Sequence, residues 1–279
     1  MTKTARTART TPTTPTTQTT RPRPTGPGRG GGFRGALAFE WTKLWSVRAT
    51  WWNLAVGLLL TVGFAAMVGA SADASAKKGI DVTVPAPHHA SQAFLISQLT
   101  VVVLATLALT GEYSSGSVRT TLQAVPARGR MLRSKTIVVT AVVAVAGCVF
   151  SVLGTLVAAP LMSGHGDYTG GELLGTALGA GVYLAALAVM SVGIGSLLRS
   201  AAGTITTLIM VLLALPQLMG VVGARWLETA SDYMPSVAGT VLLTQDHDPY
   251  GGGAALTVLV MWSLVCYGAG SAVLRRRDA

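Results

Sequence analysis

The chain has 279 residues, of which 50% are hydrophobic and only 11% are charged. Soluble globular proteins carry about 25% charged residues, so this composition excludes an ordinary soluble enzyme and an acidic disordered chain. The net charge is nevertheless +10. That excess leaves a membrane protein with basic faces or a nucleic-acid-binding protein, and the positions of the charges decide between the two.

Residues 1–32 form a low-complexity segment rich in Thr, Pro, Arg and Gly. The segment has almost nothing apolar to bury, so it predicts a disordered basic tail. Its role is open between a solvated tail without a specific partner and a tail held on anionic membrane lipids.

Residues 33–48 have apolar and aromatic side chains at helical spacing, with charged residues between them. This pattern favours a helix that lies in the membrane interface, with Trp51 and Trp52 at the level of the lipid headgroups. A plain extension of the first membrane span is the alternative. The candidate interfacial residues are Glu40, Trp41, Lys43 and Trp45.

Six apolar runs follow, and none contains Asp, Glu, Lys, Arg or His. A helix needs about 20 residues to cross the hydrocarbon core of a bilayer, so each run predicts one transmembrane helix. The fold class is therefore an all-α polytopic membrane protein, with residues 33–279 as one six-span domain. The runs are 51–70, 93–110, 137–161, 173–198, 201–222 and 254–274.

The charges divide unequally between the two sides that six spans create. One side, with both chain ends, has 18 Lys and Arg against three acids, whereas the other has three Lys and Arg against eight acids. The positive side is expected in the cytoplasm, so both termini are predicted inside, in the cytoplasmic membrane. Membrane orientation then explains the excess of basic residues, so this excess no longer supports a nucleic-acid partner.

The spans also lack the residues that several membrane activities need. An ion-coupled transporter usually keeps an ionisable group near mid-membrane, and an intramembrane protease needs a base or metal ligands. The four histidines fall in predicted external loops without metal-ligand spacing, so they are interpreted as solvated residues. No metal site, catalytic residue or bound cofactor is predicted for this chain.

The most informative stretch is the predicted cytoplasmic connection at residues 111–135. Glu112 follows the second span directly, a segment of about two helical turns comes next, and Pro126 ends it before a run of basic residues. A basic loop that only sets orientation would explain the cations, but it would not explain Glu112, Gly116 and Pro126.

These motifs resemble those of the type-2 permease subunits of ATP-binding-cassette (ABC) exporters. The likeness covers nearly all of the chain after the tail: a Glu-x-x-Lys before the first span, a Glu-Gly-Leu-Pro-Arg-Lys order before the third, and a Tyr-x-Pro-Ser element before the last. The matching residues of the connection are Glu112, Gly116, Ser117, Leu122, Pro126, Arg128 and Lys135, and those of the external element are Tyr233, Pro235 and Ser236. Arg119, within the same connection, is a further candidate coupling residue.

The resemblance implies that residues 111–135 form the helix that couples the permease to a separate ATPase subunit. It also implies a second permease, identical or different, and contact with membrane lipids. The chain has no Gly-x-x-x-x-Gly-Lys-Ser/Thr motif, so ATP and Mg²⁺ would be bound by the partner. A family of this kind exports hydrophobic or amphipathic substrates and performs no covalent chemistry itself.

Two other functions remain open from the residues alone. A non-transporting membrane anchor or sensor would use its basic tails as a docking surface. A six-span enzyme acting on lipids would need acids or histidines gathered at one membrane face. The candidates for such a cluster are Asp232, Asp246, His247 and Asp248.

Overall fold

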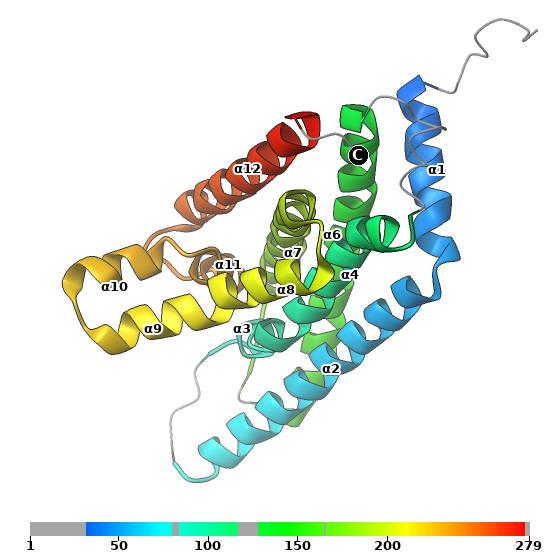
Figure 1. Cartoon of the computed structure of the whole chain (residues 1–279). Coiled ribbons are helices and arrows are strands. Elements are labelled where there is room, and N and C mark those ends of the chain that lie inside the picture. The colour runs from blue at the N-terminus through cyan, green and yellow to red at the C-terminus, as the bar shows by residue number, and fades with distance from the viewer. Residues whose placement is uncertain (1–31, 80–83, 117–127, 165, 277–279) are drawn as a thin grey trace, which may run out of the picture.

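The structure is a computed structural model that describes residues 32–79, 84–116, 128–164 and 166–276 (Figure 1). All regular secondary structure in these ranges is helical, as the sequence predicts. The elements are α1 (Gly32–Ser46), α2 (Arg48–Ala76), α3 (Ala86–Ser91), α4 (Phe94–Ser114), α6 (Arg128–Leu161), α7 (Gly170–Leu198), α8 (Ala201–Ile209), η1 (Met210–Ala214), α9 (Leu215–Val222), α10 (Arg225–Asp232), α11 (Pro235–Thr244) and α12 (Gly252–Arg276).

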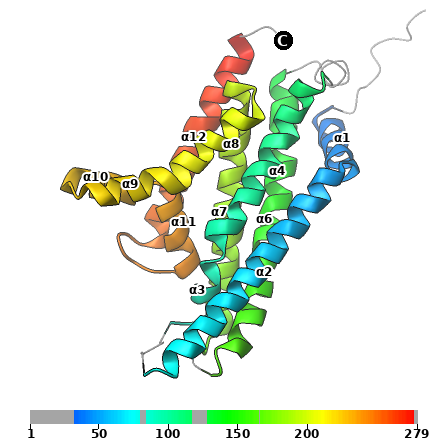
Figure 2. The same cartoon turned by 60° about the horizontal axis from the view of Figure 1, so that its bottom comes forward.

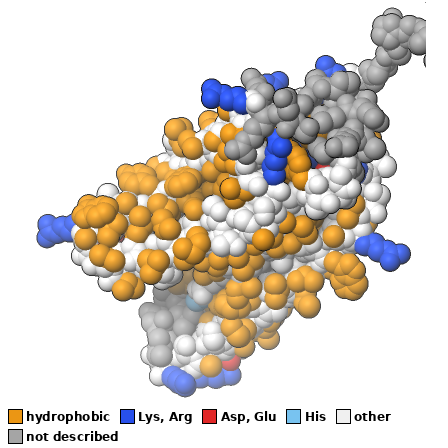
Figure 3. Space-filling view, in the orientation of Figure 1, with side chains coloured by type: hydrophobic (Ala, Val, Ile, Leu, Met, Phe, Trp, Pro, Cys, Tyr) orange, Lys and Arg blue, Asp and Glu red, His pale blue; other side chains and the backbone are white. Residues whose placement is uncertain are grey.

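Six helical stretches are long and apolar enough to cross a membrane, and they coincide with the six predicted runs. They are α2, α4, α6, α7, the continuous α8–η1–α9 stretch and α12. Figure 3 shows the corresponding surface: hydrophobic side chains are spread over much of the visible face, and few charged side chains lie among them. The prediction of a multi-pass membrane architecture is confirmed at this level.

Helix α7 lies at the centre of the bundle and packs against α4, α6 and α12. Leu184, Leu187 and Met190 are fully buried there. At Gly193 the backbone of α12 comes so close that a Cβ atom would overlap Cys266. Small residues permit such close approach of membrane helices, because lipid offers no hydrophobic drive for association and van der Waals packing must supply it.

The fifth membrane stretch is bent: α8 packs on α4 and α7, whereas α9 leaves the bundle. Its middle is the π-helical turn η1, which ends two residues before Pro216 of α9. Proline has no N–H to donate, and a π-turn is one way to absorb the lost bond. Figures 1 and 2 show α9 and α10 projecting away from the other helices, and Val221 is 84% exposed.

The connections alternate between two ends of the bundle. Figure 2 shows α1, the end of α4, the beginnings of α6 and α8, and the end of α12 together at one end, which we call the α1 end. The other end, called the α3 end, contains α3, the end of α6 and the beginning of α7. The first and last described residues therefore lie on the same side, as an even number of spans requires.

The connection between α9 and α12 folds back onto the bundle. Helix α11 packs against α7 and α12, and half or more of its residues are buried. Gly175 and Gly179 of α7 make this approach possible, because a Cβ atom at either position would overlap Gln245 or the carbonyl of Leu242. The Gly-x-x-x-Gly motif of α7 thus accommodates a short helix rather than another membrane span.

Candidate functional site

Helix α1 meets α2 at a tight elbow at the α1 end. Val47 is extended (φ −90°, ψ 121°) and separates the two helices. The Thr50 hydroxyl donates to the Leu44 carbonyl at 2.6 Å, and the Trp51 indole donates to the Trp45 carbonyl at 3.2 Å. These two bonds use carbonyls that the end of α1 leaves without helical partners, and they fix the angle between α1 and α2.

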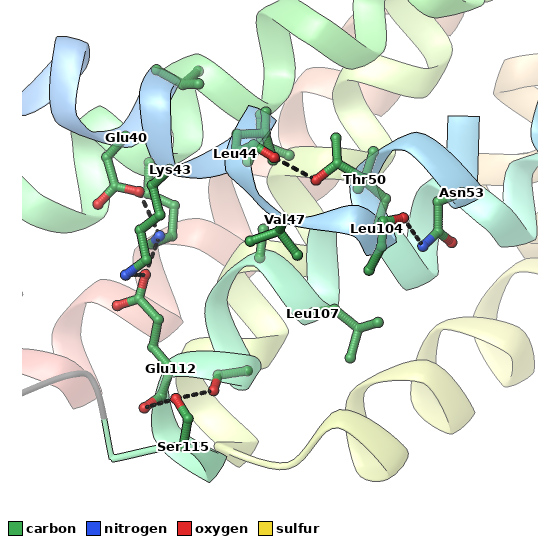
Figure 4. A pocket seen from close by; sticks show the side chains of 16 residues that line it. Glu40, Lys43, Leu44, Val47, Thr50, Asn53, Leu104, Leu107, Glu112 and Ser115 are labelled. Carbon is green, nitrogen blue, oxygen red and sulfur yellow. Dashed lines mark hydrogen bonds and ion pairs between the residues drawn. The ribbon is translucent and has the colours of Figure 1, made fainter. Parts of the chain in front are cut away.

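Four charged residues meet where α1 crosses the end of α4 and the beginning of α6. Lys135 donates to Glu40 at 2.6 Å and to Glu112 at 2.5 Å, and Lys43 donates to the same oxygen of Glu112 at 2.8 Å. Lys135, Glu40 and Glu112 are 3–4% exposed, whereas the Lys43 side chain is 28% exposed. We call these four residues the ionic cluster; Figure 4 shows part of it.

The ionic cluster carries no net charge, but its stability depends strongly on each of its four residues. Burying charges costs several kcal/mol per ion, and close partners offset that cost only while all of them are present. Lys135 is the bridge, since it joins a carboxylate from α1 to one from α4. The cluster therefore fastens three helices together at the two points where the 117–127 connection leaves and rejoins the bundle.

The bundle-facing side of α1 differs from the apolar face that the spacing favours. Ala36, Glu40 and Leu44 are its buried residues, one helical turn apart, while Trp41 is 50% exposed. Trp45 is half-buried and lies edge-on to Trp41. A carboxylate can occupy the inner face here because Lys135 of α6 lies opposite, and no sequence pattern reveals that distant partner.

A pocket of about 250 Å³ adjoins the ionic cluster beneath the α1–α2 elbow. Figure 4 shows its walls, with Leu44 and Val47 on one side and Leu104 and Leu107 on the other. Its lining is mostly apolar. The charged groups lie at the end with Glu112, whereas Thr50 and Asn53 lie on the opposite side (Figure 4). One oxygen of Glu112, Oε2, is buried without a hydrogen-bond partner among the described residues.

The predicted coupling residues divide between the bundle and the connection. Glu112 lies in the last turn of α4, and Gly116 follows in the left-handed region (φ 70°) that favours glycine. The backbone of Arg128 begins α6, so the basic run up to Lys135 is helical rather than a loop. Four of the predicted residues lie outside the described residues: Ser117, Arg119, Leu122 and Pro126.

The predicted external element joins α10 to α11. Pro235 is the first residue of α11, where its missing N–H costs nothing. The Tyr233 carbonyl accepts from the Trp262 indole of α12 at 2.9 Å, and its ring stacks on Tyr250 at 5.8 Å between centroids. The buried Ser236 faces a pocket of about 540 Å³ at the α3 end.

This α3-end pocket lies between α3, α4, α7 and α11. Its deepest polar groups are Gln98 and Tyr183, both buried, and the Tyr183 hydroxyl donates to the Gln98 side-chain oxygen. His88 lies on the wall. Burial lowers the pKa of His88, and the negative charges of Glu172 and Asp246 oppose this effect only in part, so the pocket favours the neutral form of His88.

The acids and histidine that a lipid-modifying enzyme would need lie at the end of α10 and in the loop after α11. Asp246, His247 and Asp248 are exposed in the loop after α11, and Asp246 accepts from the His247 backbone at 2.7 Å. Asp232 contributes its backbone carbonyl to a bond with Tyr250. In the part of the chain that the structure describes, no group of three or more His, Cys, Asp or Glu residues could hold a metal ion.

Sequence reasoning named all four members of the ionic cluster but did not pair them. Glu40 and Lys135 are 95 residues apart along the chain, so only the packing of α1 on α6 reveals the contact. The Gln98–Tyr183 bond was missed altogether. Its only signal is that these are polar side chains within otherwise apolar spans, and such residues usually find partners on neighbouring helices.

Neither a scan against protein-family models nor a search of curated proteins found a match to this chain.

Proposed function

We propose that this protein is the permease subunit of an ABC exporter whose ATPase is a separate polypeptide. The observation that carries the proposal is the ionic cluster, which gathers the Glu-x-x-Lys of α1 and both flanks of the 117–127 connection at one point. The motif residues that resemble a coupling element are therefore adjacent in space. The proposal places the α1 end in the cytoplasm, because that side holds most of the Lys and Arg.

In this proposal the cluster transmits movement rather than binding the motor. When the ATPase closes on nucleotide, it displaces the 117–127 connection. Because Glu112 and Lys135 hold the two flanks of that connection and Glu40 holds α1, the displacement passes to α1, α4 and α6 as one unit. Such a unit can bias the six helices between an inward-facing and an outward-facing state.

The roles of the predicted residues divide accordingly. Lys135, Glu40 and Glu112 are buried against one another, so we assign them to positioning. Direct contact with the ATPase requires accessible side chains. Arg130 and Arg133 at the beginning of α6 are exposed, so we assign them, together with Arg119, to the docking surface.

The test is reconstitution of the chain with the ATPase encoded by a neighbouring reading frame. We expect Arg119→Glu to weaken co-purification of the two proteins by about tenfold or more, because like-charge contacts at an interface cost several kcal/mol, and to abolish permease-stimulated ATP hydrolysis. Arg225→Glu is the matched control, since this exposed residue begins α10, far from the α1 end.

Two results would remove the proposal. One is the absence of any nucleotide-hydrolysing protein that binds the chain, which would favour a membrane anchor or sensor. The other is unchanged coupling and export by the Arg119→Glu protein. A six-span lipid enzyme would be favoured instead if activity on lipids were lost in Asp246→Asn combined with His247→Ala.

A further inference from the structure

The α3-end pocket has the size and construction of a small-molecule site. Its volume of about 540 Å³ lies within the roughly 300–1,000 Å³ range of ligand pockets, which are mostly apolar with a few placed polar groups. Phe94, Leu95 and Leu243 supply apolar wall, and the Gln98–Tyr183 bond forms a buried polar floor. Because floor and walls come from three different helices, the shape of the pocket is set by the packing of the bundle.

The charge of this pocket is negative. No Lys or Arg lies among the described residues that line it, and the carboxylate of Asp246 is at its edge. Glu172 is close enough to influence the same histidine as Asp246. The pocket favours the neutral form of His88, since burial lowers its pKa, so an anionic ligand would meet uncompensated repulsion.

We infer that the α3-end pocket binds a monovalent organic cation: a protonated amine carried on an apolar or aromatic body. The amine pairs with the Asp246 carboxylate at the edge, and the body lies against Phe94, Leu95 and Leu243. The side-chain amides and hydroxyls of the lining, such as Gln92 and Thr244, complete the hydrogen bonds of the ammonium group.

The composition of the pocket favours this ligand over a neutral sugar. A sugar needs hydrogen bonds around its whole ring, whereas the floor of this pocket has most of its polarity occupied internally: the Gln98 amide donates to the Leu95 carbonyl at 3.0 Å and its oxygen accepts from Tyr183. The Ser91, Thr240 and Thr244 hydroxyls of the lining likewise donate to carbonyls of their own helices, so few donors are left for a sugar ring.

Identifying this ligand as the exported substrate rests on the proposed function, but the binding itself does not. The test therefore uses the purified chain alone, in nanodiscs of phosphatidylcholine, a lipid without net charge. The probe is monodansylcadaverine, a fluorescent primary amine, compared with its N-acetyl derivative, which has the same body without the charge. Binding is read from dansyl fluorescence after subtraction of empty nanodiscs.

Two variants locate the site. Asp246→Asn removes the charge and keeps the shape; Asp248→Asn is the matched control, because it makes the same change in the same exposed loop but at a residue that does not line the pocket. Thr240→Trp fills the pocket from an exposed position on α11, so it should abolish binding of both probes.

We expect the amine to bind the unaltered chain about 1.5- to fivefold more tightly than the acetylated probe, the range for an exposed ion pair. Asp246→Asn should make the two affinities equal, and Asp248→Asn should leave the difference intact. Equal binding of both probes to the unaltered chain would overturn the inference, as would no saturable binding, or an equal loss in both Asn variants. Unchanged coupling in the Arg119→Glu protein, which would remove the proposed function, leaves this binding result untouched.

Discussion

Lys135 offers the sharpest test of how the α1 end is held together. Replacing it with Met keeps most of the side-chain volume but removes the cation that bridges Glu40 and Glu112. Both carboxylates are 4% exposed, so they would be left in a poorly solvated site. Removing one partner of a buried ion pair typically costs about 3–5 kcal/mol, because the remaining charge is uncompensated.

The same structure predicts what should restore stability. Combining Lys135→Met with Glu40→Gln and Glu112→Gln removes the buried charges together, and neutral replacements of a buried ionic group are often close to neutral in stability. Lys43 loses its ion pair with Glu112 in this triple variant, but its side chain is 28% exposed and water can solvate it. We expect the triple variant to be more stable than Lys135→Met alone.

Thermal unfolding of the purified protein in nanodiscs, followed by tryptophan fluorescence, measures both effects. A loss of about 3–5 kcal/mol corresponds to a fall in melting temperature of about 6–20 °C for a chain of this size class. Arg133→Met is the matched control. Arg133 is exposed and lies close to Lys135 in α6, so this substitution should change the free energy of unfolding by no more than about 0.5 kcal/mol.

The prediction is refuted if the Lys135→Met protein has the same melting temperature as the Arg133→Met control. It is also refuted if the triple variant is no more stable than the Lys135→Met protein. The first result would show that the contacts of Lys135 do not stabilise the helix junction. The second would show that the loss arises from packing rather than from buried charge.

The remaining predictions concern helix packing, pH and orientation. Gly179→Ala should lower stability by about 1–3 kcal/mol, because its Cβ would overlap a backbone carbonyl of α11 that cannot move aside, whereas Gly63→Ala in the open middle of α2 should be neutral or slightly stabilising; equal melting temperatures would refute the close approach. Burial lowers the pKa of His88 below its usual 6.5, so the unfolded chain binds the proton more readily and stability should fall as the pH drops below about 6.5. His88→Gln should weaken that dependence in unfolding measured from pH 8 to 5, and His247→Gln, in an exposed loop, should not. A cysteine at exposed Lys78 should react with an impermeant maleimide in intact cells, and reaction only after permeabilisation would reverse the proposed orientation.

The six spans could be predicted because each is a continuous apolar run, a signal that needs no knowledge of neighbouring helices. The ends of the helices were less predictable. Helix α6 begins at Arg128, well before the apolar run at 137, since basic residues are compatible with a helix that extends beyond the hydrocarbon core. The face of α1 was also uncertain, because Glu40 is buried only by virtue of a lysine on another helix.

Composition, the lengths of the apolar runs and the positions of the basic residues were sufficient to predict an all-helical, six-span architecture with both termini on one side. These properties follow from transfer of single segments into lipid, and each segment contributes independently. The ionic cluster, the return of α11 onto α7 and the α3-end pocket depend instead on pairs such as Lys135 with Glu40, or Tyr183 with Gln98. Residues so far apart in the chain meet only through tertiary packing, and that packing decided which of the suspected residues became one site.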